Sequence, residues 1–173
     1  MLPPLQDQHV LILGLGISGL SMARWCARQG ARVTVVDTRA APPQLEALQR
    51  DVPAARFVNS AFDASLVQGT DVRAVFSSPG LSPDQVAPVL LAASSAGLWT
   101  SGELGLFAQA LADLRTSQAY APAVLAVTGT NGKTTVTSLT GQLVQRAGKS
   151  VAVAGNIGPA LMDTFCQHLD AAS

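Results

Sequence analysis

The chain has 173 residues, of which 11 are Lys or Arg and 11 are Asp or Glu, so its formal net charge is zero. Charged residues make up 13% and hydrophobic residues 48% of the composition. This excludes intrinsic disorder, because a disordered chain combines low hydrophobicity with high net charge. A neutral chain also lacks the basic surface that binds nucleic acid or an anionic membrane. We therefore expect a folded protein that binds neither.

The cysteine content and the first residues favour a cytoplasmic protein. Cys26 and Cys166 form no C-x-x-C pair and cannot build a disulfide framework, which indicates a reducing compartment. The first nine residues contain no Lys or Arg, so the basic region of a signal peptide is missing. The apolar stretch 10–23 is too short and too rich in glycine to cross a bilayer. We expect a monomer in the cytoplasm.

Short apolar runs alternate with helical stretches over the first two thirds of the chain. The predicted strands are 10–13, 32–36, 74–77 and 98–100. The predicted helices are 17–29, 43–50, 83–95 and a last one that continues from the fourth strand through residue 114. Strands that alternate with helices predict an α/β fold, here a Rossmann-like parallel sheet with helices on both faces.

A second unit follows a segment without apolar periodicity at 115–122, and we place the domain boundary between residues 115 and 116. The predicted elements of the unit are a strand at 123–127, a helix at 133–146, a strand at 150–154 and a final helix that begins at Pro159. A single βαβ unit cannot cover both faces of its own sheet. We therefore expect residues 116–173 to be the beginning of a larger domain.

The first glycine-rich loop, residues 14–19, has the pattern G-x-G-x-x-G between a predicted strand and a predicted helix. In this motif Gly14 permits the tight turn, Gly16 lets a diphosphate approach the backbone, and Gly19 allows the helix to pack closely on the strand. The N-terminus of the helix offers free N–H groups to an anion. The pattern predicts a nucleotide site, and the alternative is a turn needed only for packing.

An acidic residue stands where Rossmann folds often bind a ribose hydroxyl. Asp37 ends the second predicted strand, 18 residues beyond Gly19. Arg39 suits the 2′-phosphate of NADP, or is a solvated cation of the loop. The loop and these two side chains do not say which nucleotide binds.

The second glycine-rich loop, residues 126–135, also follows a strand and opens a helix. It is similar to a P-loop, although Val127 stands where the first glycine of G-x-x-x-x-G-K-[ST] would fall. Its amides would hold phosphate oxygens, Lys133 would neutralise the β- and γ-phosphates, and the Thr134 hydroxyl would bind Mg²⁺. The alternative is a turn followed by a surface lysine. The residues predicted to bind ATP are Gly129, Thr130, Asn131, Gly132, Lys133, Thr134 and Thr135.

Two further turns lie at the carboxyl ends of predicted strands, where ligands bind in open parallel sheets. They are 77–80 and 155–158, and Asn156 of the second could face a cleft. Each is equally well explained as an ordinary turn. Glu103 follows the fourth predicted strand, and we expect it to cap or solvate the start of a helix.

The two loops in this order resemble those of the Mur ligases of bacterial cell-wall synthesis. The segments 14–19, 36–39, 78–80 and 155–158 look like the branch of that family that adds D-glutamate to UDP-N-acetylmuramoyl-L-alanine. The resemblance implies that the first domain binds the UDP part of this substrate rather than NAD. The substrate-binding residues that it implies are Ile17 and Ser18 at the diphosphate, Asp37, Thr38 and Arg39 at the uracil, and Gly80 and Asn156 along the substrate path.

The resemblance also implies the reaction. ATP and Mg²⁺ activate the substrate carboxylate as an acyl phosphate, and the amine of D-glutamate then attacks it; Lys133 and Thr134 are the implied catalytic residues, with Thr134 as a metal ligand. The family's later Mg²⁺ ligands have no counterpart in these 173 residues, so we expect no ligase activity from them alone. Two other hypotheses are an NAD(P)-binding oxidoreductase, which leaves the second loop unexplained, and a P-loop regulatory NTPase with a scaffold domain.

Overall fold

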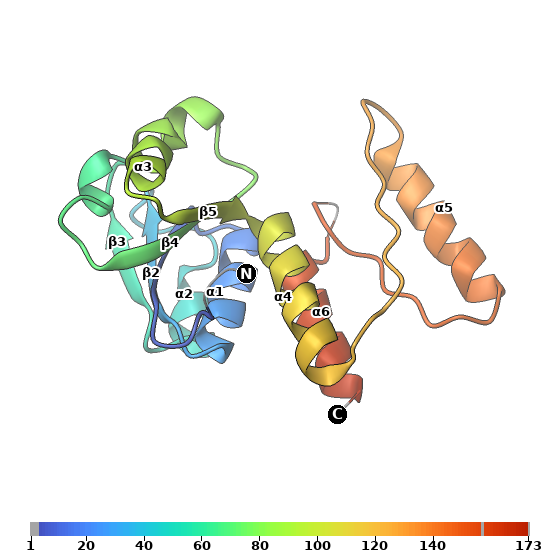
Figure 1. The fold of residues 1–173 in the computed structure, drawn as a ribbon. Coiled ribbons are helices and arrows are strands. Elements are labelled where there is room, and N and C mark those ends of the chain that lie inside the picture. Colours follow the sequence, from blue (N-terminus) through green and yellow to red (C-terminus); the bar gives the residue numbers. More distant parts are fainter. Residues whose placement is uncertain (1–3, 157, 173) are drawn as a thin grey trace.

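A computed structural model describes residues 4–156 and 158–172, and its first part is a parallel sheet of five strands (Figure 1). The order in the sheet is β3-β2-β1-β4-β5, and every neighbouring pair is parallel. The strands are β1 (His9–Leu13), β2 (Arg32–Asp37), β3 (Arg56–Asn59), β4 (Val72–Ser77) and β5 (Trp99–Gly102). The predicted α/β fold with a Rossmann-like parallel sheet is confirmed.

Helices cover both faces of this sheet because the side chains of each strand alternate between them. The helices of the described residues are α1 (Ile17–Arg28), α2 (Leu45–Asp51), the 3-10 helix η1 (Ala64–Leu66), α3 (Pro83–Ser95), α4 (Glu103–Gln118), α5 (Lys133–Arg146) and α6 (Leu161–Ala172). Val10 and Ile12 of β1 pack among the core residues of α1, α2, α4 and α6, whereas Leu11 and Leu13 pack against α3 and η1. All four side chains are at most 2% exposed.

The edge strand β3 is absent from the sequence prediction. It has four residues, of which only Phe57 and Val58 are apolar, too few to show an alternating pattern. Its strand conformation depends on pairing with β2, in which Val35 lies beside Phe57 and Val36 beside Val58.

The prediction of strands at 123–127 and 150–154 is wrong. Both segments flank α5 in Figure 1, but they have no strand conformation and no ladder of backbone hydrogen bonds. A strand needs a partner for its N–H and C=O groups, and every strand of the described residues belongs to the first sheet. Val124 and Leu125 are accordingly 54% and 67% exposed.

The last helix begins two residues later than predicted. The carbonyl of Pro159 accepts a hydrogen bond from the Gly155 N–H (3.1 Å), which keeps this proline in the preceding turn. The helix α6 starts at Leu161, and its first backbone bond runs from the Thr164 N–H to the Ala160 carbonyl (3.0 Å).

The helix α6 packs beside α1 and α4 of the first unit, as Figure 1 shows. Met162 is fully buried and Phe165 is 5% exposed. The ring of Phe165 lies 5.4 Å from that of Trp25 on α1 and 5.1 Å from that of Phe107 on α4, with Tyr120 at 6.1 Å. The aromatic contacts therefore tie the end of the chain to the core of the sheet.

None of the helices within residues 4–156 and 158–172 is long and apolar enough to cross a membrane.

Replacing Phe165 by alanine is expected to destabilise the chain by about 3 kcal/mol, since truncating a buried phenylalanine leaves a cavity. Urea unfolding followed by the fluorescence of Trp25, the neighbouring ring, measures the change. Leu139→Ala is the control, because Leu139 on α5 is 54% exposed and its truncation should cost little. Equal losses for the two variants would show that α6 is not part of the core.

Candidate functional site

The first glycine loop lies at the topological switch point of the sheet. The chain runs from β1 to β2 and β3 on one side, and returns to β4 and β5 on the other. The loops after β1 and β4 therefore separate at the carboxyl ends of two adjacent strands, where open α/β sheets bind their ligands. Ser78 joins these loops: its N–H donates to the Leu13 carbonyl and its hydroxyl to the Gly14 carbonyl, each at 2.9 Å.

The three glycines of this loop have different surroundings. Gly14 has φ +84°, in the left-handed region that favours glycine. A Cβ on Gly19 would lie 2.0 Å from the Gly14 carbonyl oxygen, so helix and strand meet without room for a side chain. A Cβ on Gly16 would have no heavy atom within 4 Å. The backbone at Gly16 is thus the part of the loop that a ligand can approach.

The N–H groups of the loop divide into two sets. Gly14 donates to the Val36 carbonyl (2.8 Å), and Leu15 donates to a carboxylate oxygen of Asp37 (2.7 Å). The first turn of α1, which begins at Ile17, has N–H groups with no acceptor inside the helix. These amides and the positive end of the helix dipole form a place for an anion.

Asp37 anchors the loop. It is 2% exposed; one carboxylate oxygen accepts the Leu15 N–H, and both accept hydrogen bonds from Arg39, at 2.7 to 2.9 Å. The hydrogen bonds from the Arg39 side chain are the main cause that lowers the pKa of Asp37 from 3.8 to about 2. The carboxylate is therefore occupied within the protein, while Thr38 and Arg39 are exposed beside it. This anchoring role was missed from the sequence.

The second glycine loop turns at two glycines with positive φ. Gly129 has φ +149° and Gly132, directly before α5, has φ +74°. The ammonium group of Lys133 donates to the carbonyls of Gly129 and Thr130, the latter at 3.2 Å. The loop is exposed throughout 128–136, including the hydroxyls of Thr134 and Thr135. Figure 1 shows α5 standing apart from the sheet, so the structure does not bring the two loops together.

The remaining predicted positions are exposed turns. Gly80 lies in the loop after β4, and a Cβ on it would meet no heavy atom within 4 Å. Asn156 is exposed in the turn 155–158, which is closed by a hydrogen bond from the Gly158 N–H to the Gly155 carbonyl (3.0 Å). Ile157 of the same turn lies outside the described residues. In the described part of the chain, no group of three or more His, Cys, Asp or Glu side chains could hold a metal ion.

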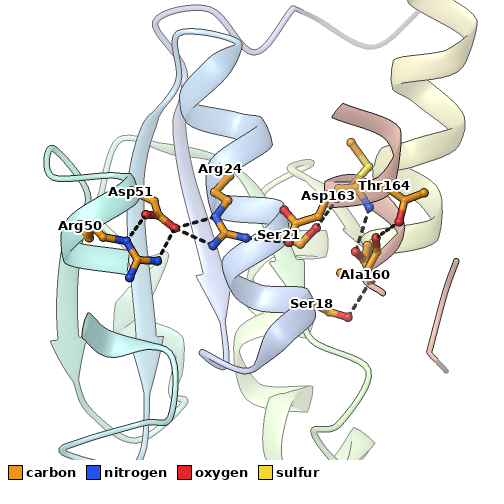
Figure 2. Close-up of polar contacts among 10 residues, drawn as sticks. Ser18, Ser21, Arg24, Arg50, Asp51, Ala160, Asp163 and Thr164 are labelled. Atoms are coloured by element: carbon orange, nitrogen blue, oxygen red, sulfur yellow. Dashed lines mark hydrogen bonds and ion pairs between the residues drawn. The ribbon is translucent and has the colours of Figure 1, made fainter. Parts of the chain in front are cut away.

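A polar network that the sequence did not predict links α1 with α6 (Figure 2). The Ser21 hydroxyl accepts the N–H of Asp163 (2.8 Å), and Arg24 donates to the Asp163 carboxylate (2.6 Å). Arg24 also pairs with Asp51 of α2 at 2.6 Å. The hydroxyl of Ser18 donates to the buried carboxylate of Glu103 (2.7 Å). The sequence feature that could have indicated this role of Glu103 is its position directly after a strand, at the ligand-binding edge of the sheet.

Both loops combine glycines with a helix N-terminus, the arrangement typical of phosphate-binding α/β proteins. Residues 8–102 match the family model "Mur ligase MurD-like, N-terminal domain", and residues 127–172 match "Mur ligase middle domain". The chain belongs to the Mur ligase family.

The relatives are named as ligases. The UDP-N-acetylmuramoylalanine–D-glutamate ligase of Albidiferax ferrireducens is 74% identical over 96% of this chain, and that of Ralstonia nicotianae is 54% identical over 99%. The chain spans about a third of their length, 33% and 34%. Among solved structures, a pseudomurein peptide ligase type C from Methanothermus fervidus matches 82% of this chain and 27% of its own, with 21% identity and a TM-score of 0.47.

The anchoring by Asp37 has a pH dependence. Because its pKa is lowered on folding, its contribution to stability is complete above about pH 4 and is lost as the pH falls toward 2. Asp37→Asn should therefore be about 2 kcal/mol less stable than the unmodified chain at pH 7, and the difference should shrink between pH 4 and pH 2. Urea unfolding at each pH measures it, and the subtraction cancels the other carboxylates.

Asp84→Asn is the matched control, since Asp84 is an exposed carboxylate in the first turn of α3. A difference between the Asp37 variant and the unmodified chain that stays constant from pH 7 to pH 2 would contradict the anchoring role.

Proposed function

We propose that this chain supplies the UDP-substrate site and part of the ATP site of a ligase that adds D-glutamate to UDP-N-acetylmuramoyl-L-alanine in peptidoglycan synthesis. The observation that carries the proposal is the glycine loop at the switch point of the sheet, followed in the same chain by a second phosphate-type loop. In this proposal residues 1–115 form the substrate-binding domain and residues 116–173 begin the ATP-binding domain. The names of the relatives support it.

The diphosphate of the substrate would bind at the first turn of α1. The amides of Ile17 and Ser18 are at this turn, and the open side of Gly16 leaves the backbone accessible to phosphate oxygens. Backbone amides bind the charge of a phosphate without basic side chains, which agrees with a chain of zero net charge. The exposed Thr38 and Arg39 would meet the uracil end, with Gly80 and Asn156 along the rest of the substrate.

The second loop would hold ATP. Gly129 and Gly132 have positive φ, the backbone amides of 129–134 would bind the phosphate oxygens, and Lys133 supplies a positive charge at the helix start. The loop fits a magnesium nucleotide in its chemistry, because the hydroxyl of Thr134 is an oxygen donor of the kind that Mg²⁺ accepts. When bound, Mg²⁺ would neutralise the charge that develops on the phosphates. The chain's own contribution is positioning and charge.

When ATP binds, the ammonium group of Lys133 would leave its present hydrogen-bond partners and contact the phosphates. Its ammonium group now donates to two carbonyls of its own loop, exposed to solvent. Transfer of the γ-phosphoryl group to the substrate carboxylate builds negative charge on the phosphate oxygens, which a lysine at this place stabilises. The acyl phosphate would form with release of ADP; the amine of D-glutamate would then attack its carbonyl carbon, and inorganic phosphate would leave as the amide bond forms. The groups that bind D-glutamate would lie outside the site residues that we assign.

The state of Asp37 favours UDP over a dinucleotide. In NAD-binding sites an acidic residue at this position accepts hydrogen bonds from a ribose hydroxyl. Here both oxygens of the Asp37 carboxylate already accept hydrogen bonds from Leu15 and Arg39. We therefore place the function with the ligases and not with the oxidoreductases. A monomer in the cytoplasm is part of the same proposal.

Binding by the 173-residue chain separates the hypotheses. UDP-N-acetylmuramoyl-L-alanine at about a hundredfold its Kd should raise the melting temperature by about 5 to 10 °C, because a ligand that binds only the folded state stabilises it. NADH at the same concentration should leave it unchanged. Differential scanning fluorimetry measures both. Stabilisation by NADH alone would contradict the proposed function and favour an NAD-binding oxidoreductase.

In a full-length ligase that contains this chain, Lys133→Ala should lower turnover by about 10²-fold or more, which corresponds to several kcal/mol of barrier. Phosphate release that depends on D-glutamate measures the turnover. The other lysine of the chain, the exposed Lys149, provides the control as Lys149→Ala. Turnover that is unchanged in the Lys133 variant would remove the ATP loop from the proposal.

A further inference from the structure

Glu103 is a buried carboxyl group at the meeting point of three helices. It is the first residue of α4 and is 7% exposed. One of its oxygens accepts the Ser18 hydroxyl of α1 at 2.7 Å, and the other accepts the Met162 N–H of α6 at 3.1 Å. Ser18 and Met162 are both the second residue of their helices. One side chain therefore joins three segments that are far apart in the sequence.

This arrangement is favourable for a carboxylate. A buried charge is tolerated where hydrogen bonds satisfy it, and each of the two oxygens has a donor. The first turn of a helix also carries free N–H groups and the positive end of the dipole. Three such helix starts surround Glu103. The carboxyl group thus links the starts of the three helices through its two hydrogen bonds.

The hydrogen bond to Glu103 limits what Ser18 can do. A serine hydroxyl has a single proton to donate, and that of Ser18 is directed to Glu103. In this structure Ser18 can therefore donate to a phosphate only through its backbone N–H. The bond also fixes the side chain at the turn of α1 where we place the diphosphate.

The same carboxyl group fixes the start of α6. The N–H of Met162 is bound by Glu103, and the next N–H, that of Asp163, is bound by Ser21. Arg24 holds the side chain of Asp163 at 2.6 Å. The turn 155–158 with Asn156 immediately precedes this anchored helix start. The diphosphate loop and the helix start that follows the Asn156 turn are thus linked by one set of contacts.

We propose that Glu103 is a positioning residue that couples the diphosphate loop to the start of α6, so that binding at the first loop tightens α6 and the turn before it. The coupling rests on the proposed function, since it requires a nucleotide at the first loop. It is reciprocal: a tighter α6 raises the affinity of the loop by the same factor. Glu103 acts through Ser18 and Met162 without touching the ligand.

Hydrogen exchange with and without UDP tests the coupling in the 173-residue chain. In the unmodified chain, saturating UDP should slow the exchange of amides 162–166 about fivefold or more. In Glu103→Ala, these amides should exchange about tenfold faster without ligand, because a hydrogen bond to a charged group is lost, and UDP should no longer slow them. UDP should also bind about fivefold more weakly, by the same reciprocity.

Three further variants separate positioning from mere stability. Glu103→Gln keeps an acceptor for the Met162 N–H and an amide facing the Ser18 hydroxyl, so it should retain the effect of UDP on α6. Ser18→Ala keeps the contact to α6 but removes the link to α1, and should abolish the effect of UDP while amides 162–166 stay protected. Glu46→Ala, the other glutamate of the chain, is exposed in the first turn of α2 and should behave like the unmodified chain.

The outcomes distinguish the two proposals. UDP binding without any change in the exchange of α6 would overturn the coupling and leave the proposed function standing. The same effect of UDP in Ser18→Ala as in the unmodified chain would also overturn the coupling. Failure of the unmodified chain to bind UDP would overturn both proposals. The tryptophan emission reports whether each variant keeps α6 in place, because one of the two tryptophans, Trp25, has its ring 5.4 Å from that of Phe165 on α6.

Discussion

The close contact of α1 with β1 is the constraint on which the rest of the structure depends. At Gly19 the helix passes so near the Gly14 carbonyl that a Cβ would lie 2.0 Å from it. This approach directs the start of α1 to the carboxyl end of the central strand, at the switch point of the sheet. The same contact brings the body of α1 onto the sheet, where Met22 and Cys26 are fully buried. The turn between β1 and α1 therefore determines the position of both the candidate site and the helix that packs on the sheet.

The buried polar side chains Asp37, Ser78 and Glu103 of the first unit form hydrogen bonds within the protein. Asp37 accepts the Leu15 N–H, Ser78 joins the loops after β1 and β4, and Glu103 joins the starts of α1 and α6. In the described residues, no buried side-chain nitrogen or oxygen lacks a hydrogen-bond partner. Such satisfied groups rigidify a site, because an unpaired buried polar atom is costly. A neutral chain can in this way present rigid amides to a phosphate.

The two units differ in how they are stabilised. The first has central strands buried on both faces and two clusters of apolar side chains. In the second, α5 exposes apolar residues such as Val136, Leu139 and Leu143, each at least 50% exposed. Among the described residues of that part, α6 and Tyr120 pack against a core, and this core belongs to the first unit. The segments on either side of α5 do not form the expected strands, because no neighbouring strand completes their backbone hydrogen bonds.

Local patterns were sufficient for the parallel sheet, its first helices and the two glycine loops, because apolar periodicity and glycine spacing act over a few residues. The family, too, was recognised from these motifs. Only the tertiary structure decided the edge strand β3, the packing of α6 on α1, the engaged state of Asp37 and the place of Glu103 between three helices. These features depend on contacts between groups 22 to 142 residues apart, such as Leu15 with Asp37, Ser18 with Glu103 and Ser21 with Asp163. Such contacts are decided by the packing of the whole sheet and not by neighbouring residues.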